Sequence, residues 1–141
     1  PRNAQFHFDV AAAISRVGTT HLETGKTRTA IQELKDALVE TEAYAGSTEA
    51  SNTDQLELTA MIHYRVATAY ERLASEQGIA PAAGAQYWRM ARTWYQQSAP
   101  LLEEAAKHRA LQPDEMQALE ATRKGEKRSG DALDRMAANR P

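Results

Sequence analysis

Apolar residues in this 141-residue chain recur at intervals of three and four positions over five separate segments. That interval matches the 3.6-residue turn of an α-helix, whereas a strand requires strict alternation, and no run of alternating β-branched residues persists here. Alanine, the residue with the highest helix propensity, occurs 27 times, against 7 glycines and 5 prolines. The pattern therefore predicts an all-α fold.

Turn-forming residues mark the ends of the first two expected helices. The first apolar stripe starts at Phe8 and ends at Gly25, a residue that readily adopts the left-handed conformation of helix C-termini. The second helix runs from Thr27, a candidate N-cap, to about Gly46, and a short polar loop over 46–53 follows it. Such a short connection predicts antiparallel packing against the next helix. The first stripe consists of Phe8, Ala11, Ile14, Val17, Gly18, His21 and Leu22.

The second half of the chain contains three further expected helices. We expect a third helix over about 54–77, a loop over 78–84 and a fourth helix over about 85–107, in which Pro100 should introduce a kink or cost a hydrogen bond. A capping helix over about 113–139 begins with a proline followed by acidic residues, which suits a first turn. Its polar middle holds two glycines and is expected to be the least stable helical segment. Its thin apolar stripe consists of Met116, Leu119, Leu133 and Met136.

Composition excludes several classes of function. The net charge is −2, from 17 basic and 19 acidic residues, so nothing favours nucleic acid as a partner. No apolar stretch approaches the ~18 residues that indicate a membrane span, and the absence of cysteine excludes disulfides and thiolate metal sites. Residues 1–141 are expected to form a single soluble domain, with the cytoplasm as the best guess for its location. Because the chain begins with Pro1 rather than Met, we expect it to be a piece of a longer protein or a processed product.

Histidines and paired carboxylates are the candidates for metal binding and acid–base chemistry. No two of the histidines are four residues apart, and no HExxH motif occurs; His21 and His63 occupy positions typical of packing residues. The acidic pairs 103–104 and 114–115 have no marked partner across a cleft, and an exposed helix surface explains them. We therefore predict no catalytic residue, no cofactor and no metal ion. The four histidines are His7, His21, His63 and His108.

Four aromatic residues cluster in the expected fourth helix and allow two interpretations. They could form a binding platform, because exposed Trp and Tyr are favoured interface anchors, or they could belong to the core. We predict core positions for Trp88 and Tyr95 and leave both interpretations open for Tyr87 and Trp94.

The sequence also repeats internally. Residues 17–25 align with 66–74 at a spacing of 49, which pairs Gly18 with Ala67 and His21 with Tyr70. A small residue at position 18 or 67 would let the partner helix approach closely. In the partner helices, the equivalent positions are Ala30, Leu34 and Ala37 in the first unit and Ala91, Tyr95 and Ser98 in the second.

This pattern resembles the tetratricopeptide repeat (TPR) family over about residues 10–105. The chain departs from the family pattern in three respects: His21 replaces an aromatic residue, Glu42 replaces a proline, and the loop of the second repeat is longer. The resemblance implies antiparallel helical hairpins stacked as a short right-handed solenoid, with repeat 1 over 8–46, repeat 2 over 54–107, and a closing helix. The matching residues are Ile14, Val17, Gly18, His21, Gly25, Ala30, Leu34 and Ala37, then Val66, Ala67, Tyr70, Ala91, Tyr95 and Ser98.

A narrower resemblance rests on the segments WRMARTWYQQSAPLLEE (88–104) and HRALQPDE (108–115). Together with the ~50-residue repeat spacing, they are similar to the C-terminal TPR region of bacterial serine/threonine protein kinases. The chain itself contains no glycine-rich loop, HRD or DFG motif. The resemblance thus implies a non-catalytic regulatory tail of a larger signalling protein.

The TPR resemblance also implies a concave groove that binds a peptide or a partner protein. Within it, the hydroxyls of Tyr64 and Thr68 and the guanidinium of Arg72 suit a peptide with carbonyls and an acidic group, although a plain exposed helix face is the alternative. Thr19 and Thr68 stand where some family members use asparagine to hold a C-terminal carboxylate, so binding of chaperone tails is not expected. The predicted groove residues are Ser15, Thr19, Leu22, Glu23, Met61, Tyr64, Thr68 and Arg72.

Three classes of function therefore follow from the sequence. The first is a protein-interaction scaffold that is not an enzyme. The second is a structural module that forms a homo-oligomer through an open N-terminal edge near Phe6 and Phe8, because two repeats are fewer than the roughly three that stable arrays need. The third is a small-ligand or enzymatic activity without a recognisable motif. A kinase domain upstream in the gene would favour the first class, and a strictly monomeric chain would weaken the second.

Overall fold

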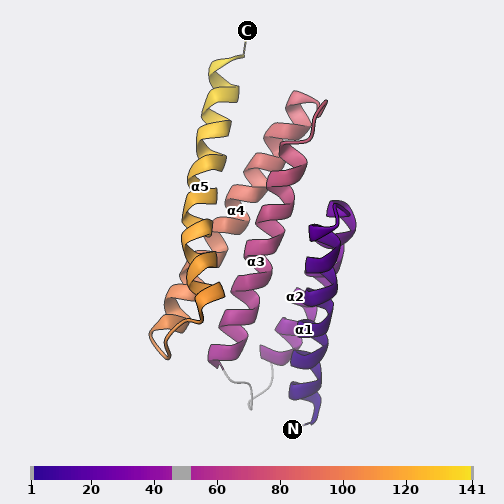
Figure 1. Ribbon diagram of the computed structural model, residues 1–141, viewed down its shortest axis with the longest axis vertical. Coiled ribbons are helices and arrows are strands. Elements are labelled where there is room, and N and C mark those ends of the chain that lie inside the picture. Colours follow the sequence, from indigo (N-terminus) through magenta and orange to yellow (C-terminus); the bar gives the residue numbers. More distant parts are fainter. Residues whose placement is uncertain (1, 46–51, 141) are drawn as a thin grey trace.

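The computed structural model describes residues 2–45 and 52–140 and contains five helices (Figure 1). They are α1 (Arg2–Glu23), α2 (Thr27–Ala45), α3 (Asn52–Ala74), α4 (Pro81–Ala106) and α5 (Pro113–Ala138). The described residues include no strand, which confirms the all-α prediction. Within the same two ranges, no helix combines the length and the apolar character needed to cross a bilayer.

The helix ends differ from the predicted ones where the apolar stripe does not extend to the terminus. α1 begins at Arg2, six residues before Phe8, because over residues 4–7 only Ala4 is buried and no stripe results. α4 begins at Pro81 instead of residue 85, since proline at a first helical position gives up no hydrogen bond. Of the loop predicted over 46–53, residues 46–51 lie outside the described part, and α3 already includes the last two. α4 runs without a break through Pro100, which is exposed.

Consecutive helices pack antiparallel, as their cross-helix contacts demonstrate. His7 near the start of α1 meets Glu40 near the end of α2, and Ser98 of α4 donates a hydrogen bond of 2.8 Å to the carbonyl of Ala60 in α3. α3 also packs against both α2 and α1, and α5 packs in the same way against both α4 and α3. The helices are therefore arranged side by side from α1 at one edge to α5 at the other (Figure 1).

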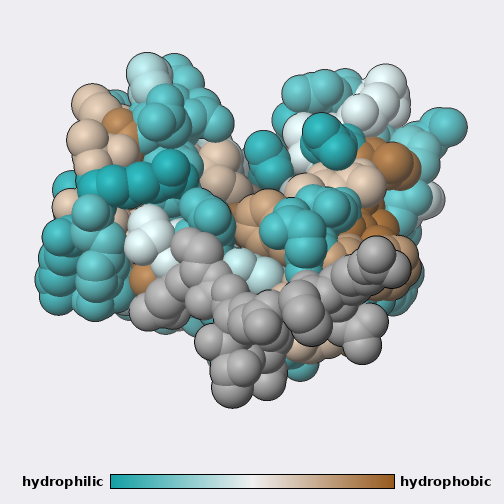
Figure 2. All heavy atoms as spheres, turned by 90° about the horizontal axis from the view of Figure 1, so that it is seen from below, coloured by the Kyte–Doolittle hydropathy of each residue, from teal (hydrophilic) through white to brown (hydrophobic). Residues whose placement is uncertain are grey.

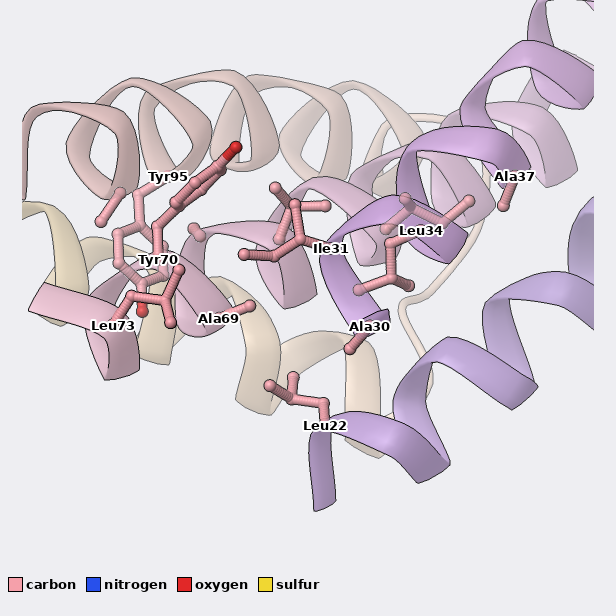
Figure 3. Packing of buried hydrophobic residues seen from close by; sticks show 13 residues of the cluster. Leu22, Ala30, Ile31, Leu34, Ala37, Ala69, Tyr70, Leu73 and Tyr95 are labelled. Atoms are coloured by element: carbon pink, nitrogen blue, oxygen red, sulfur yellow. The ribbon is translucent and has the colours of Figure 1, made fainter. Parts of the chain in front are cut away.

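The main hydrophobic core lies where the two hairpins meet, with side chains from α1, α2, α3 and α4 (Figure 3). The aligned small and large positions of the partner helices are buried, whereas His21 of the aligned pair His21 and Tyr70 is only partly buried. Gly18 faces α2 without room for a side chain, since a Cβ there would lie 2.9 Å from Cγ of Leu34. This confirms the predicted close approach. Val17, which the stripe placed in the core, is instead 50% exposed because it lies one helical position away from the contact.

α5 buries a face that the sequence analysis did not predict. Met116 of the expected stripe is 58% exposed, and the residues against α4 and α3 are mostly small. Gly125 allows this packing, because a Cβ at that position would lie 2.4 Å from Cζ of Tyr95. The polar middle of α5 therefore contains a close approach to α4. The buried face consists of Glu115, Ala118, Thr122, Gly125, Ser129 and Ala132.

The aromatic cluster of α4 divides between core and surface. Tyr95 is almost fully buried, as predicted, and Tyr87 and Trp94 pack partly buried against the core. Tyr87 stacks on Tyr70 with ring centroids 6.1 Å apart. Trp88 is only partly buried and does not belong to the core clusters, so its predicted core position is wrong. A single helix can direct only some of four closely spaced aromatic residues toward the same neighbour.

Candidate binding groove

A groove runs along the length of α3 between α1 and α5. Three adjoining hollows make up this groove: the upper and central ones share Tyr64, Thr68 and Arg72, and the central and lower ones share Met61 and Arg65. Figure 2 shows the corresponding hollow in the surface between two ridges, which are formed by the α1 side and the α5 side of the molecule. α3 thus forms the floor of the groove, and helices from both ends of the chain form its walls.

The structure brings seven of the eight predicted groove residues together in the central hollow. They come from one face of α1 and one face of α3, at the spacing that a helix requires. Ser15 is the exception, because it is buried behind the groove, where its hydroxyl accepts a hydrogen bond from the guanidinium of Arg65. Leu22 lines the groove with little exposure and belongs mainly to the core. The seven residues are Thr19, Leu22, Glu23, Met61, Tyr64, Thr68 and Arg72.

Sequence reasoning missed Arg65 and the entire α5 wall. Asp114, Gln117 and Ala118 complete the central hollow from the first turns of α5. They were missed because α5 was expected to pack through its large apolar residues. The small residues at positions 118, 122, 125 and 129, spaced three and four apart, were the signal that could have identified the packed face.

The upper end of the groove is lined by a hydrogen-bonded network around Tyr95. The hydroxyl of Tyr95 donates to Oε2 of Glu71 at 2.6 Å, and Arg128 of α5 binds the same carboxylate through Nε at 2.7 Å and Nη2 at 3.1 Å. Burial, followed by the bond to Glu71, raises the pKa of Tyr95 well above its ordinary value. The network therefore holds α5 against α3 and α4 with a neutral phenol and a fully paired carboxylate.

The lower end is lined by Arg109, in the segment between α4 and α5. Its Nε donates to Oε1 of the buried Glu57 at 2.7 Å, its Nη2 binds the other oxygen of that carboxylate, and Asp54 lies 3.7 Å away. Glu115 accepts a bond of 2.8 Å from the backbone N–H of Gln112 and so caps the start of α5. The charged groups at this end are therefore largely engaged with one another.

The centre of the groove holds two arginines on one face of α3. Arg65 donates from Nη1 to Oγ of Ser15 at 3.1 Å, and Arg72 donates from Nη1 to the backbone carbonyl of Leu22. Burial lowers the pKa of Arg65, an effect that the charges of Asp114 and Glu23 partly oppose. Neither guanidinium forms an ion pair with a carboxylate among the described residues. Both are thus cations whose only assigned acceptors are uncharged.

Two of the predicted peptide-contacting groups are partly engaged within the protein. The hydroxyl of Thr68 donates a hydrogen bond of 3.0 Å to the carbonyl of Tyr64, one turn earlier, and lies 3.4 Å from the hydroxyl of Tyr95. Tyr64 packs against the main core and against a second cluster of Ala60, Leu102 and Ala118, and it also lines the groove. A substitution of Tyr64 that removes the ring would therefore disturb packing as well as binding.

The histidines make local contacts that do not form a metal site. His7 pairs with Glu40 and His21 with Glu33, each through Nδ1 at 2.6 Å, and both pairs join α1 to α2. His63 packs edge-on against Trp94 with ring centroids 5.0 Å apart, and burial lowers its pKa. Within residues 2–45 and 52–140, no three His, Asp or Glu residues are grouped so that they could hold a metal ion.

Comparisons of the chain with family models, with curated proteins and with solved structures gave no match.

Proposed function

We propose that this chain is a non-enzymatic interaction module that binds an extended peptide, or a segment of a partner protein, in the groove along α3. The observation that carries the proposal is the continuity of the groove, which presents polar and apolar groups over most of the length of one helix. A compact substrate needs an enclosed pocket, whereas an elongated open groove fits a peptide chain. Hydroxyls, guanidinium groups and the Met61 side chain supply the mixed chemistry that peptide recognition uses.

The helix arrangement supports a TPR-like solenoid as the framework of this module. α3 packs on the two helices before it, and α5 packs on the two helices before it, so one packing relation occurs twice. On this basis we propose that the chain is a short helical array. From the similarity of segments 88–104 and 108–115 to bacterial kinase tails, we propose further that it serves as the regulatory region of a larger bacterial protein of the kinase-like class.

Selection of peptides from a random display library on the immobilised full chain tests the proposed function. Gln117→Trp would place a large ring in the central hollow, so peptides selected on the wild-type chain should lose most of their binding to this variant. Gln86→Trp is the matched control, because Gln86 is also an exposed helical glutamine but lies on α4, outside the groove. Failure to select any peptide, or equal binding to both variants, would contradict the proposal.

A second candidate function is self-association through the outer face of α1 and α2. Phe6 is 61% exposed and Val17 50% exposed on α1, eleven residues or about three turns apart on one side of the helix. Val39 on α2 is 62% exposed. Large apolar residues on the outer hairpin favour an interface there. Sedimentation of the wild-type chain should then show an oligomer that Phe6→Glu converts to a monomer, and a monomeric wild type would exclude this role.

A further inference from the structure

The two arginines at the centre of the groove define the chemistry of its ligand. We propose that Arg65 and Arg72 bind two carboxylates of an extended peptide whose acidic residues are three positions apart. The inference rests on the proposed function, since it specifies the ligand of the same groove.

Both guanidiniums are held in place by a hydrogen bond within the protein and still have N–H donors without an assigned acceptor. Each makes one hydrogen bond to α1, to Ser15 in one case and to the Leu22 carbonyl in the other, and these bonds hold the side chains toward the α1 wall of the groove. A guanidinium carries five N–H donors in a planar fork, so several donors on each arginine remain for a ligand. Arg109 and Arg128 at the two ends already have carboxylate partners within the protein, which leaves the central pair as the anion-binding groups.

The spacing of the arginines sets the spacing of the acidic residues. Arg65 and Arg72 are seven residues apart on α3, which corresponds to about 10 Å along the helix axis. In a polyproline-II peptide, residues i and i+3 point to the same side and are separated by about 9 Å. Two acidic residues with two residues between them therefore match the two guanidiniums, whereas neighbouring acidic residues reach only one.

The walls of the groove exclude a strongly acidic tract. Glu23 on α1 and Asp114 on α5 are exposed at the two sides of the central hollow, and both act electrostatically on Arg65. Additional acidic residues in the ligand would approach these carboxylates and be repelled. The groove thus favours two separated carboxylates over a run of them.

The test uses peptides selected on the full chain and blocked by Gln117→Trp, measured by fluorescence anisotropy. We expect the selected sequences to contain Asp or Glu at positions i and i+3. Changing either acidic residue to Gln or Asn should weaken binding to the wild-type chain at least tenfold, because a charge-assisted hydrogen bond is lost. Arg65→Gln and Arg72→Gln should each cause a similar loss, whereas Arg89→Gln, on the exposed surface of α4, should not.

The peptide substitutions keep the test decisive even if an arginine variant folds poorly, since they are made in the ligand. Groove-dependent peptides that lack acidic residues, or that bind equally well after the Gln or Asn changes, would overturn this inference and leave the proposed groove function standing. Tighter binding of a hexaglutamate tract than of the i, i+3 peptides would also overturn it. If no groove-dependent peptide is obtained, the proposed function fails together with the inference.

Discussion

Replacing Gly125 with alanine tests the close packing of α5 on Tyr95. The added Cβ would lie 2.4, 2.5 and 2.8 Å from Cζ, Cε2 and Cε1 of the ring, far closer than van der Waals contact allows. The ring has little freedom to move away, because Tyr95 is 1% exposed and its hydroxyl is bound to Glu71 at 2.6 Å. The helices must therefore separate, or the network at the upper end of the groove must break.

The expected size of the effect follows from two opposing contributions. Overpacking a well-packed site costs about 1–3 kcal/mol, and overlap with three atoms of an anchored ring places this site at the upper end. Alanine gains about 1 kcal/mol over glycine in helix propensity. A net destabilisation of about 2 kcal/mol remains, which for a chain of this length lowers Tm by about 4–8 °C.

Thermal and denaturant unfolding followed by circular dichroism measures this change, with Gly130→Ala as the matched control. Gly130 lies five residues further along α5, and the atoms nearest to a Cβ there belong to Arg92 at 3.9 and 4.0 Å, an ordinary contact. The control should gain up to about 1 kcal/mol from helix propensity alone. The same substitution is thus expected to have opposite signs at two positions of one helix. Equal stabilisation by both would refute the packing of Gly125 against Tyr95.

Three further predictions concern stability. Gly18→Leu should lower the unfolding free energy by about 1–3 kcal/mol or more, because the new side chain overlaps the buried Leu34. A variant with the denaturation midpoint of the wild type would contradict the packing of α1 on α2. Thr122→Val should raise the unfolding free energy by about 1 kcal/mol, since the buried hydroxyl of Thr122 has no hydrogen-bond partner among the described residues; a loss of stability would reveal a partner. For His63, burial lowers the folded-state pKa below the unfolded value of about 6.5. The unfolded chain therefore binds the proton first as the pH decreases. The free energy of unfolding should then fall from about pH 7 toward the lower folded-state pKa. His63→Phe keeps an aromatic ring against Trp94 and should flatten this part of the pH–stability curve, and an unchanged curve would show that His63 does not cause it.

The helices and the close contact at Gly18 could be predicted from sequence because both depend on local periodicity. Large apolar residues three and four positions apart identify a buried face, and a small residue within such a face indicates a near neighbour. The same reasoning failed for α5, where Gly125 and Ser129 form the contact while Met116 faces solvent. Small residues permit close approach between helices but carry little hydrophobic signal, so the stripe of methionines and leucines was mistaken for the packed side.

The sequence predicted most of the residues that line the groove but not the hydrogen bonds between them. Family resemblance and helical spacing placed seven residues of α1 and α3 in one groove. Ser15 was assigned to the groove surface although it lies behind Arg65, because residues four positions apart, such as Ser15 and Thr19, share one face of a helix. The bond between these two residues joins positions 50 apart in the chain, and no local pattern specifies a contact of that kind.

The position of α5 at one end of the helix row couples the groove to the local stability of that helix. α5 contacts only α3 and α4 among the described elements, so its separation would leave the contacts among the other four helices intact. The groove has its second wall only in molecules where α5 is docked, and the apparent Kd of a ligand that needs this wall equals the intrinsic Kd divided by the docked fraction. A ligand that spans α3 and α5 would raise that fraction in turn, and would slow hydrogen exchange of the α5 amides beyond the residues it touches.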